Sequence, residues 1–545
     1  MRAADQIVRT LEAHGIGRVY CVPGESYLAL LDALHGSSIR VIVCRHEGGA
    51  GFMACAEAKL TGKPSVFMVS RGPGATNASI AIHMAEQDGL PVILMVGQVA
   101  REERTRGVFQ EVDYTAFFGS MAKGVYEITE GARAREMMSR GLLQAQVGVP
   151  GPVVFSLPED MLRDDVADEA PLVYPLPELG HGSAVIAKIQ NVIDAAERPV
   201  VIAGAGLRSP EGKVALQRFA EAQRIPVAVS WKSQDVFDNS SSLYAGHLGF
   251  GSPQNFRDQL AEADVILAFG TRLGDVGTLH HTFPAAPEPH QFVVHVYADA
   301  KPLGRVARID LPVLANPVAV LADLAQSARV VNTTREAWVS KLNGFVKGMQ
   351  AFTPRNPADG VDFGEVTMAL AKFAPTDCTL TMDAGNSTTW VHRHWPMTPE
   401  NMLIGGVVGA MGLGVPAAVA ASLVQPERMA ICIVGDGGVL MTGNELATAV
   451  AYGASPKIVI SDNGIYGTIR THQEREYPGR VSGTMLSNPD FAAWARSFGV
   501  AAFTLSLGDD VEETVRAFLA EPGAAVLHVR SSRVSLSAFG VLREG

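Results

Sequence analysis

The residues best placed to do chemistry lie in two short turns, each directly after an apolar run. Asp436, Gly437 and Gly438 follow AICIVG, and Asn463 follows KIVIS. Parallel strands bring such turns to one ligand-binding edge of a sheet. Glycines let backbone N–H groups face a phosphate, and Mg²⁺ prefers carboxylate and amide oxygens. The turns therefore predict a site for Mg²⁺ and a phosphate group, although Asp-Gly and Asn-Gly pairs are also common in ordinary turns.

Other polar groups follow further apolar runs. Glu47 comes after RVIVCRH and opens a predicted helix. A carboxylate there can relay a proton, and the helix dipole also favours an acidic residue at that position. Residues 383–387 (DAGNS) and 204–206 (GAG) end two more runs. A single G-x-G is weak as a nucleotide-binding motif.

Apolar runs that alternate with helical patterns must position these groups. The alternation predicts an α/β fold of doubly wound parallel sheets with helices on both faces. The expected strands lie in residues 18–24, 40–47, 65–70, 91–99, 199–206, 264–275, 292–299, 379–386, 430–438, 457–464 and 524–530. Three domains are expected, at residues 1–165, 183–330 and 355–535, with a Pro-rich acidic linker at 166–182 and a polar break around 330–360. Similar phrases in the first and third regions, GLPVILMVGQV and ASPKIVISDNG, suggest related folds.

Composition excludes several classes of protein. At about 150 residues per domain, 545 residues are enough for three to four domains. The net charge of -11 gives no electrostatic support for binding nucleic acid. The five cysteines form no C-x-x-C pair, which argues against a disulfide framework or a zinc site and favours a reducing cytoplasm.

One stretch has the length of a membrane span. Residues Leu403 to Val424 carry no charge and are long enough to cross a bilayer. The stretch is rich in glycine and contains Pro416, so we expect a buried turn and helix beneath a ligand instead. The first 15 residues read as an amphipathic helix without the apolar core of a signal peptide. We therefore expect no membrane association.

The spacing of the two turns resembles the signature of thiamine diphosphate enzymes, in which GDG is followed by about two dozen residues and an asparagine. Here 25 residues separate Gly437 from Asn463, and the usual Asn-Asn pair is Asp462-Asn463. The resemblance implies that Asp436, the side chain of Asn463 and the carbonyl of Ile465 bind Mg²⁺, which holds the diphosphate. It implies further cofactor contacts from five residues: Gly385, Asn386, Ser387, Gly437 and Gly438.

Nearly the whole chain resembles the acetolactate synthase-like branch of that family. The similar phrases include YCVPGESYLALLDAL, RHEGGAGFMA, SRGPGATNASIAI, FQEVDYTAFFG, GPVVFSLPEDM and FGTRLGD. The resemblance implies a pyrimidine-binding, a central Rossmann-like and a diphosphate-binding domain. It also implies a 2-oxo acid decarboxylase and carboligase that joins a pyruvate-type donor to a second carbonyl, with the thiazolium as electron sink.

The same resemblance assigns roles around the cofactor. Glu47 would hydrogen-bond N1' of the pyrimidine, and Gln110 would lie near the cofactor. In GGVVGAMGLG, Met411 would bend the cofactor and the carbonyl of Gly409 would accept from its 4'-amino group. By analogy, Glu47 of one chain would face the diphosphate site of another, so a homodimer or homotetramer is expected.

Several departures leave the substrate and one cofactor open. Glu25 stands where the synthases usually have glycine; it is either an acid like that of pyruvate decarboxylases, whose paired-histidine motif has no counterpart that we identify, or a helix N-terminal residue. Thr468 and His472, four apart and so on one helix face, replace the Met and Trp of the synthase substrate pocket. Arg272 stands where that group has an FAD-contacting arginine, which leaves FAD open.

Two alternative functions remain at this point. One is simple decarboxylation to an aldehyde, as in benzoylformate decarboxylase-like enzymes. The other is a noncatalytic nucleotide- or FAD-binding protein on a Rossmann-like scaffold, which the fold alone would not exclude.

Overall fold

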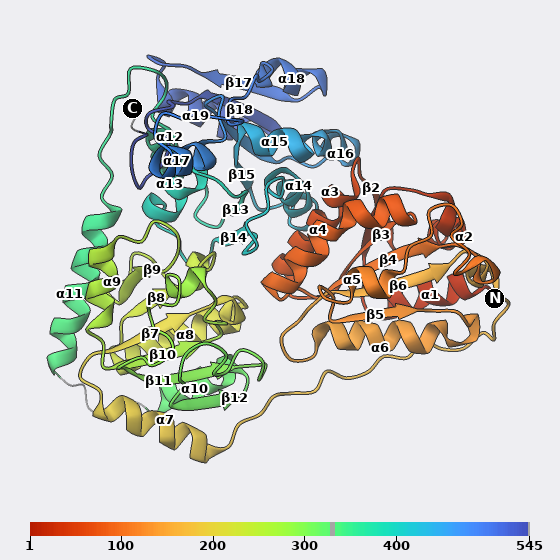
Figure 1. Ribbon diagram of the computed structural model, residues 1–545, viewed down its shortest axis with the longest axis horizontal. Helices are drawn as coiled ribbons and strands as arrows, with labels where there is room; N and C mark the ends of the chain where they lie inside the picture. The colour runs from red at the N-terminus through yellow and green to blue at the C-terminus, as the bar shows by residue number, and fades with distance from the viewer. Residues whose placement is uncertain (328–332, 543–545) are drawn as a thin grey trace.

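Three six-stranded parallel sheets form the chain, as the alternation of apolar runs predicts. The computed structural model describes residues 1–327 and 333–542. All the strand pairs of the three sheets are parallel, and helices flank each sheet (Figure 1). Each of the 11 expected strand segments contains a strand. The chain is therefore an α/β protein built from three such units.

The first unit has the strand order β2-β1-β3-β4-β6-β5. Its strands are β1 (Arg18–Cys21), β2 (Arg40–Val43), β3 (Ser65–Val69), β4 (Val92–Gln98), β5 (Gly124–Glu127) and β6 (Val153–Pro158). Its helices are α1 (Ala3–Ala13), α2 (Leu28–His35), α3 (Glu47–Thr61), α4 (Gly72–Asp88), α5 (Tyr114–Phe118) and α6 (Ala134–Gln146). Residues 166–182, which then run along the outside to α7, contain no helix or strand (Figure 1).

The middle unit has the strand order β12-β11-β10-β7-β8-β9, which is the order 3-2-1-4-5-6 of a dinucleotide-binding sheet read from the other edge. Its strands are β7 (Pro199–Ala203), β8 (Val227–Val229), β9 (Tyr244–His247), β10 (Val265–Phe269), β11 (Phe292–Tyr297) and β12 (Leu311–Leu314). Its helices are α7 (Ser183–Ala195), α8 (Pro210–Gln223), α9 (Gln254–Ala261), α10 (Pro317–Gln326) and α11 (Thr333–Gln350).

Helix α11 corrects the expected polar break around residues 330–360. It buries Trp338, Val339, Leu342 and Val346 against the middle core. Their spacing is helical, but the polar residues between them hid it from the sequence analysis. The end of the predicted 183–330 domain and the first residues of the predicted break lie outside the described residues.

The third unit repeats the topology of the first. Its order, β14-β13-β15-β16-β18-β17, matches β2-β1-β3-β4-β6-β5 strand for strand, in agreement with the related folds suggested by the sequence phrases. Its strands are β13 (Thr379–Met382), β14 (Met402–Gly405), β15 (Ala430–Gly435), β16 (Lys457–Asp462), β17 (Ala501–Leu505) and β18 (Ala525–Arg530). Its helices are α12 (Phe363–Phe373), α13 (Ser387–His394), α14 (Gly414–Val424), α15 (Asp436–Thr442), α16 (Leu446–Tyr452), α17 (Gly467–Glu476), α18 (Phe491–Ser497) and α19 (Val511–Ala520).

The first and third units share one hydrophobic core. Side chains of α3 and α4 belong to the same buried cluster as those of α14 and α16. The uncharged stretch from Leu403 to Val424 forms most of β14, a glycine-rich turn and the buried helix α14, so the expected turn and helix are present. Within residues 1–327 and 333–542, no helix has the length and hydropathy that a membrane span needs.

Candidate active site

Three neighbouring strands of the third sheet end in the polar turns singled out by the sequence. β13, β15 and β16 are adjacent and parallel, and they lead into Asp383, Asp436 and Asn463. β13 has β14 on one side and β15 on the other, so this edge contains the point where the strand order reverses and open sheets bind ligands. The N–H of Gly464 donates to Oδ2 of Asp436 at 2.8 Å, which ties two of the turns together.

Asp436 is 4% exposed and surrounded by donors. Its Oδ1 accepts from the N–H of Gly437 at 2.9 Å, and its Oδ2 also accepts from the Asn488 amide at 2.8 Å. Asn488 donates as well to Asp462 at 2.7 Å. Burial raises the pKa of Asp436 to about 6, and these hydrogen bonds oppose that rise. A carboxylate whose ionised form is unfavourable in isolation is well suited to a cation.

The other two predicted metal ligands, Asn463 and Ile465, lie together on the turn after β16. The amide oxygen of Asn463 accepts from the N–H of Ile465 at 3.1 Å, and the Asn463 carbonyl accepts from Arg533 at 2.9 Å. Searching the described part of the chain finds no group of three or more His, Cys, Asp or Glu side chains arranged to hold a metal. A metal here would therefore depend on one carboxylate and neutral oxygens, a donor set that suits Mg²⁺.

The two glycines of the Asp436 turn are required by close packing. A Cβ on Gly437 would lie 2.5 Å from the Tyr466 ring, and one on Gly438 would lie 2.1 Å from the Asp383 carboxylate. The sequence analysis attributed these glycines to the approach of a phosphate. The structure gives a second reason for these glycines, because a side chain at either position would prevent α15 from packing against Tyr466 and Asp383.

A glycine-rich turn, residues 406–412, packs against the loop after β13. Asp383 accepts from the N–H groups of Gly412 at 2.7 Å and Gly414 at 2.5 Å. Burial raises the pKa of Asp383 to about 6 in spite of these donors. Gly409 lies on the exposed side of the turn with φ +73°, and Met411 is half-buried. The predicted pyrimidine contacts thus lie beside the predicted diphosphate loop.

Helix α17 adds Thr468 and His472. The Thr468 hydroxyl donates to the Asn386 amide oxygen at 3.0 Å, so it contacts the predicted diphosphate loop, which also carries Gly385 and Ser387. His472 is exposed and accepts from Arg475 at 2.7 Å. The structure therefore brings Thr468 to the site, whereas His472 lies one turn further along an exposed helix.

Three predicted residues lie in the first unit. Glu47 opens α3, and its Oε2 accepts from the Asn77 amide at 2.9 Å. Gln110 has a left-handed backbone, with φ 63°, and within the described residues its Oε1 is buried without a hydrogen-bond partner. Glu25 begins a 3₁₀ turn; its side chain is 62% exposed and lies 3.7 Å from Arg71. Strained or unsatisfied groups of the Gln110 kind are typical of functional sites.

Glu445 of the third unit holds the start of α3. Its carboxylate is buried and accepts from the N–H groups of Arg45 at 2.9 Å and His46 at 3.0 Å, directly before Glu47. Thr448 donates to it at 2.6 Å. Burial raises the pKa of Glu445 against these hydrogen bonds. The position of Glu47 is thus coupled to the third unit of the same chain.

The GAG turn of the middle unit is also explained by packing. A Cβ on Gly204 would lie 2.5 Å from Thr271, and one on Gly206 would lie 3.0 Å from Gly270. Arg272 donates to the Gln87 side chain at 3.0 Å and so joins the middle unit to the first. A cavity of about 1340 Å³ borders both features.

The sequence analysis missed several residues of the site. Asn77, Asn488 and Glu445 act through contacts distant in sequence, and none directly follows a strand; Asn77 belongs to the phrase SRGPGATNASIAI, but no role was predicted for it. The predicted residues at the three strand ends could be found from the sequence because an apolar run precedes each of them.

Taken together, the fold and the gathered turns define a three-unit enzyme class that binds a phosphate-bearing cofactor at one sheet edge. Models of the thiamine pyrophosphate enzyme N-terminal, central and C-terminal domains match residues 1–117, 186–324 and 383–529. The chain belongs to the thiamine pyrophosphate enzyme family, in its acetolactate synthase-like branch.

Relatives place it within that branch. It is 30% identical to the acetolactate synthase large subunit of Parasynechococcus marenigrum, over 97% of this chain and 87% of that protein. The large subunit of Lactococcus lactis is also 30% identical, over 93% and 89%. A probable large subunit of Methanocaldococcus jannaschii is 31% identical, over 95% and 89%. The chain is thus a thiamine diphosphate-dependent carboligase of the acetolactate synthase type, and neither alternative function is favoured.

Proposed function

We propose that this enzyme decarboxylates a pyruvate-type 2-oxo acid and joins the remaining fragment to a second carbonyl compound. The single observation that carries the proposal is the joining of the Asp436 and Asn463 turns at the switch point of the third sheet. When bound, thiamine diphosphate supplies the electron sink for the bond next to the substrate carbonyl. The remaining steps fall to this chain's own residues.

Mg²⁺ is the proposed metal, with Asp436, Asn463 and the carbonyl of Ile465 as its protein ligands. The fit rests on the donor set, which contains only hard oxygens on two turns already in contact. The neighbouring diphosphate contacts that we propose come from two loops, one after β13 and one after β15. They are Gly385, Asn386, Ser387, Gly437 and Gly438.

Glu47 is the proposed proton relay at N1' of the pyrimidine. The Asn77 amide fixes one oxygen of its carboxylate, and Glu445 fixes the backbone before it. Gly409 and Met411 would also contact the pyrimidine. Gln110 would contribute its unpartnered amide oxygen, and Glu25 remains either a catalytic acid or a residue that begins the 3₁₀ turn.

A second copy of the chain is proposed to complete the site. No hydrogen bond or ion pair in the described residues links Glu47 to Asp436, Asn463 or Met411. Exposed apolar side chains flank both halves of the site: Phe109 and Ile80 in the first unit, and Leu440 and Met441 in the third. A dimer or tetramer should appear in sedimentation, and Leu440→Arg should give inactive monomers; a fully active monomer would overturn this part.

The five buried, unpaired cysteines agree with the cytoplasmic location that we propose.

Product analysis tests the proposed reaction. Bound ligands of the purified protein are identified by mass spectrometry, and the enzyme is then given a panel of 2-oxo acids with and without aldehyde and 2-oxo acid acceptors. We expect a coupled hydroxy-ketone product and release of CO₂. Release of the free aldehyde alone would favour a decarboxylase of the benzoylformate type instead.

The acceptor is proposed to be larger or more polar than pyruvate. Thr468 reaches the cofactor loop, and His472 follows on the same helix face, where the resembling synthases carry Met and Trp. His472→Trp should shift kcat/KM towards small apolar acceptors, with Arg496→Gln, an exposed residue on α18, as control. Equal acceptor ratios in wild type and His472→Trp would exclude His472 from substrate selection.

FAD is proposed as an additional ligand of the middle unit, near Arg272. The cavity of about 1340 Å³ offers space, although packing already accounts for Gly204 and Gly206. FAD-loaded protein should be yellow, and Arg272→Ala should lose the colour. Colourless protein that takes up no added FAD would refute this assignment.

A further inference from the structure

Strand β14 is an edge strand whose outer side is covered by charged side chains. Its inner side pairs with β13, where the N–H of Met402 donates to the carbonyl of Cys378 at 3.3 Å. Backbone groups of the alternate residues point away from the sheet. Such edge groups need partners when they are buried. In this chain the partners come from the other two units.

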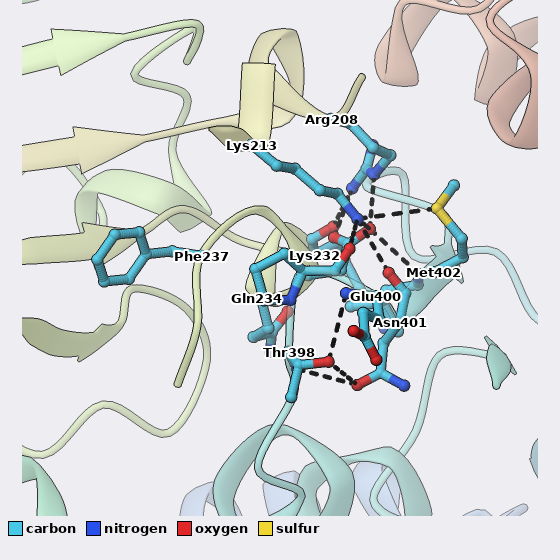
Figure 2. Close-up of polar contacts among 12 residues, drawn as sticks. Arg208, Lys213, Lys232, Gln234, Phe237, Thr398, Glu400, Asn401 and Met402 are labelled. Carbon is cyan, nitrogen blue, oxygen red and sulfur yellow. Dashed lines mark hydrogen bonds and ion pairs between the residues drawn. The ribbon is translucent and has the colours of Figure 1, made fainter. Parts of the chain in front are cut away.

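The middle unit covers the first half of the strand. Nζ of Lys213 donates to the carbonyls of Pro399 and Asn401, both at 2.9 Å, and Figure 2 shows this side chain pointing from α8 towards Asn401 and Met402. The Asp235 carboxylate accepts from the N–H of Leu403 at 3.2 Å. Lys213 and Asp235 thus hold three backbone groups: two carbonyls of residues just before β14 and one N–H within it.

The first unit covers the second half. Nζ of Lys59, on α3, donates to the carbonyl of Gly405 at 2.9 Å. Oδ1 of Asp88, at the end of α4, accepts from the N–H of Val407 at 2.8 Å. The two side chains form an ion pair of 3.2 Å, and they are only 2% and 1% exposed.

These charges are deeply buried, and each is paired. Asp235 is fully buried between Arg208 at 3.2 Å and Lys213 at 3.8 Å. A buried ion pair adds little net stability, because removing two charges from water offsets their attraction. Removing one partner, however, leaves the other uncompensated. Such a pair therefore fixes a geometry more than it stabilises a fold.

The covered strand leads directly to the cofactor-facing turn. Gly405 is the last residue of β14, and residues 406–412 follow with Gly409 and Met411. Asp383 holds the far end of that turn through Gly412 and Gly414. The turn is therefore fixed at its start by the first and middle units and at its end by the third.

We propose that Lys59, Asp88, Lys213 and Asp235 are positioning residues that hold the outer edge of β14 and thereby set the turn carrying Gly409 and Met411 against the cofactor. The inference rests on the proposed function, because it requires that turn to contact thiamine diphosphate. It makes the cofactor site sensitive to how the three units are arranged, although none of the four side chains needs to touch the cofactor.

The test uses full-length Lys59→Met, Asp88→Asn and Lys213→Met, with Lys372→Met as control. Lys372 forms an exposed ion pair of 2.7 Å with Glu512 on the far side of the third unit. Hydrogen exchange of peptides covering residues 401–412 reports the strand edge directly. Titration with thiamine diphosphate at saturating Mg²⁺ gives the cofactor Kd, and steady-state kinetics separate kcat from KM.

We expect faster exchange in residues 401–412, a higher cofactor Kd and a kcat reduced up to about 10²-fold by misplacement of the turn, with little change in KM. The control should match wild type in all of these. Lys59→Arg, which keeps the charge, serves if Lys59→Met does not fold, and it should show smaller changes in the same direction.

Two results would overturn the inference: unchanged exchange in residues 401–412, or faster exchange with unchanged Kd and kcat. The second would make the contacts purely structural. Wild-type protein that binds no thiamine diphosphate would instead refute the proposed function, so the two failures are distinguishable.

Discussion

Among single residues, Glu47 should have the largest effect on turnover without affecting the fold. Its carboxylate is held by Asn77 at the start of α3. Glu47→Gln keeps the shape but removes the proton relay, so kcat should fall about 10²- to 10⁴-fold. Thermal unfolding should stay close to that of wild type. Near-wild-type kcat in Glu47→Gln would remove this residue from the mechanism.

We expect Asp436, as the proposed metal ligand, to make cofactor binding depend on pH. Burial raises the pKa of Asp436 to about 6, and Mg²⁺ requires the ionised form. As the pH falls through that value the carboxylate takes up a proton, so apparent Mg²⁺ affinity should fall by about tenfold per pH unit below it. Calorimetric titration between pH 8 and 5 measures this. Affinity that stays constant down to pH 5 would contradict the assignment.

The residues found from sequence are those that follow strands. Asp436, Asn463 and Glu47 each come after an apolar run, and parallel strands necessarily end at one edge. Asn488 and Asn77 fix the orientation of two of these side chains, yet their contacts span 52 and 30 residues of sequence. No local pattern encodes such pairs, so the supporting hydrogen bonds emerge only from the folded chain.

At the scale of elements, the junction between α3 and Glu445 couples the two cofactor-binding units. Glu445→Ala would leave the N–H groups of Arg45 and His46 without an acceptor, which should cost about 1–3 kcal/mol of unfolding free energy. Glu445→Gln keeps an acceptor and should cost less. Urea unfolding measures both, and kcat should fall more in the Ala variant. Equal stability in Ala, Gln and wild type would show that this junction does not anchor α3.

Strand prediction succeeded for most of the long apolar runs, although the fully buried β6 was not among the expected strands. Long buried strands such as β4 and β15 were evident as apolar runs. β8 was not predicted because it has only three residues. The edge strand β12 was not predicted because it is partly exposed, so its residues differ little in hydropathy from those around it. Helix α11 was missed because polar residues separate its buried positions. The edge strand β14 was not predicted as a strand, because most of it belongs to a longer uncharged stretch. The charged side chains that contact it come from the other units and left no sign in the local sequence.

At the scale of the whole molecule, two units of identical strand order enclose one shared core. The sequence suggested this relation only through short phrases, whereas the strand order displays it directly. Charged side chains of the first and middle units then reach β14 in the third. Figure 2 shows Lys213 of the middle unit beside the start of this strand. If the proposed site is correct, its geometry depends on the arrangement of all three units, although its predicted ligands lie on separate turns.

The central claim is that this protein binds thiamine diphosphate through Mg²⁺ held by Asp436. Ligand at 100 times its Kd stabilises a fold by about 2.7 kcal/mol. Thermal unfolding is therefore measured with cofactor, with Mg²⁺ and with both, in wild type, Asp436→Ala and the exposed control Asp258→Ala. We expect both ligands together to raise the Tm of wild type and control but to leave the Tm of Asp436→Ala unchanged. An equal rise in Asp436→Ala would contradict the assignment of Asp436 as metal ligand.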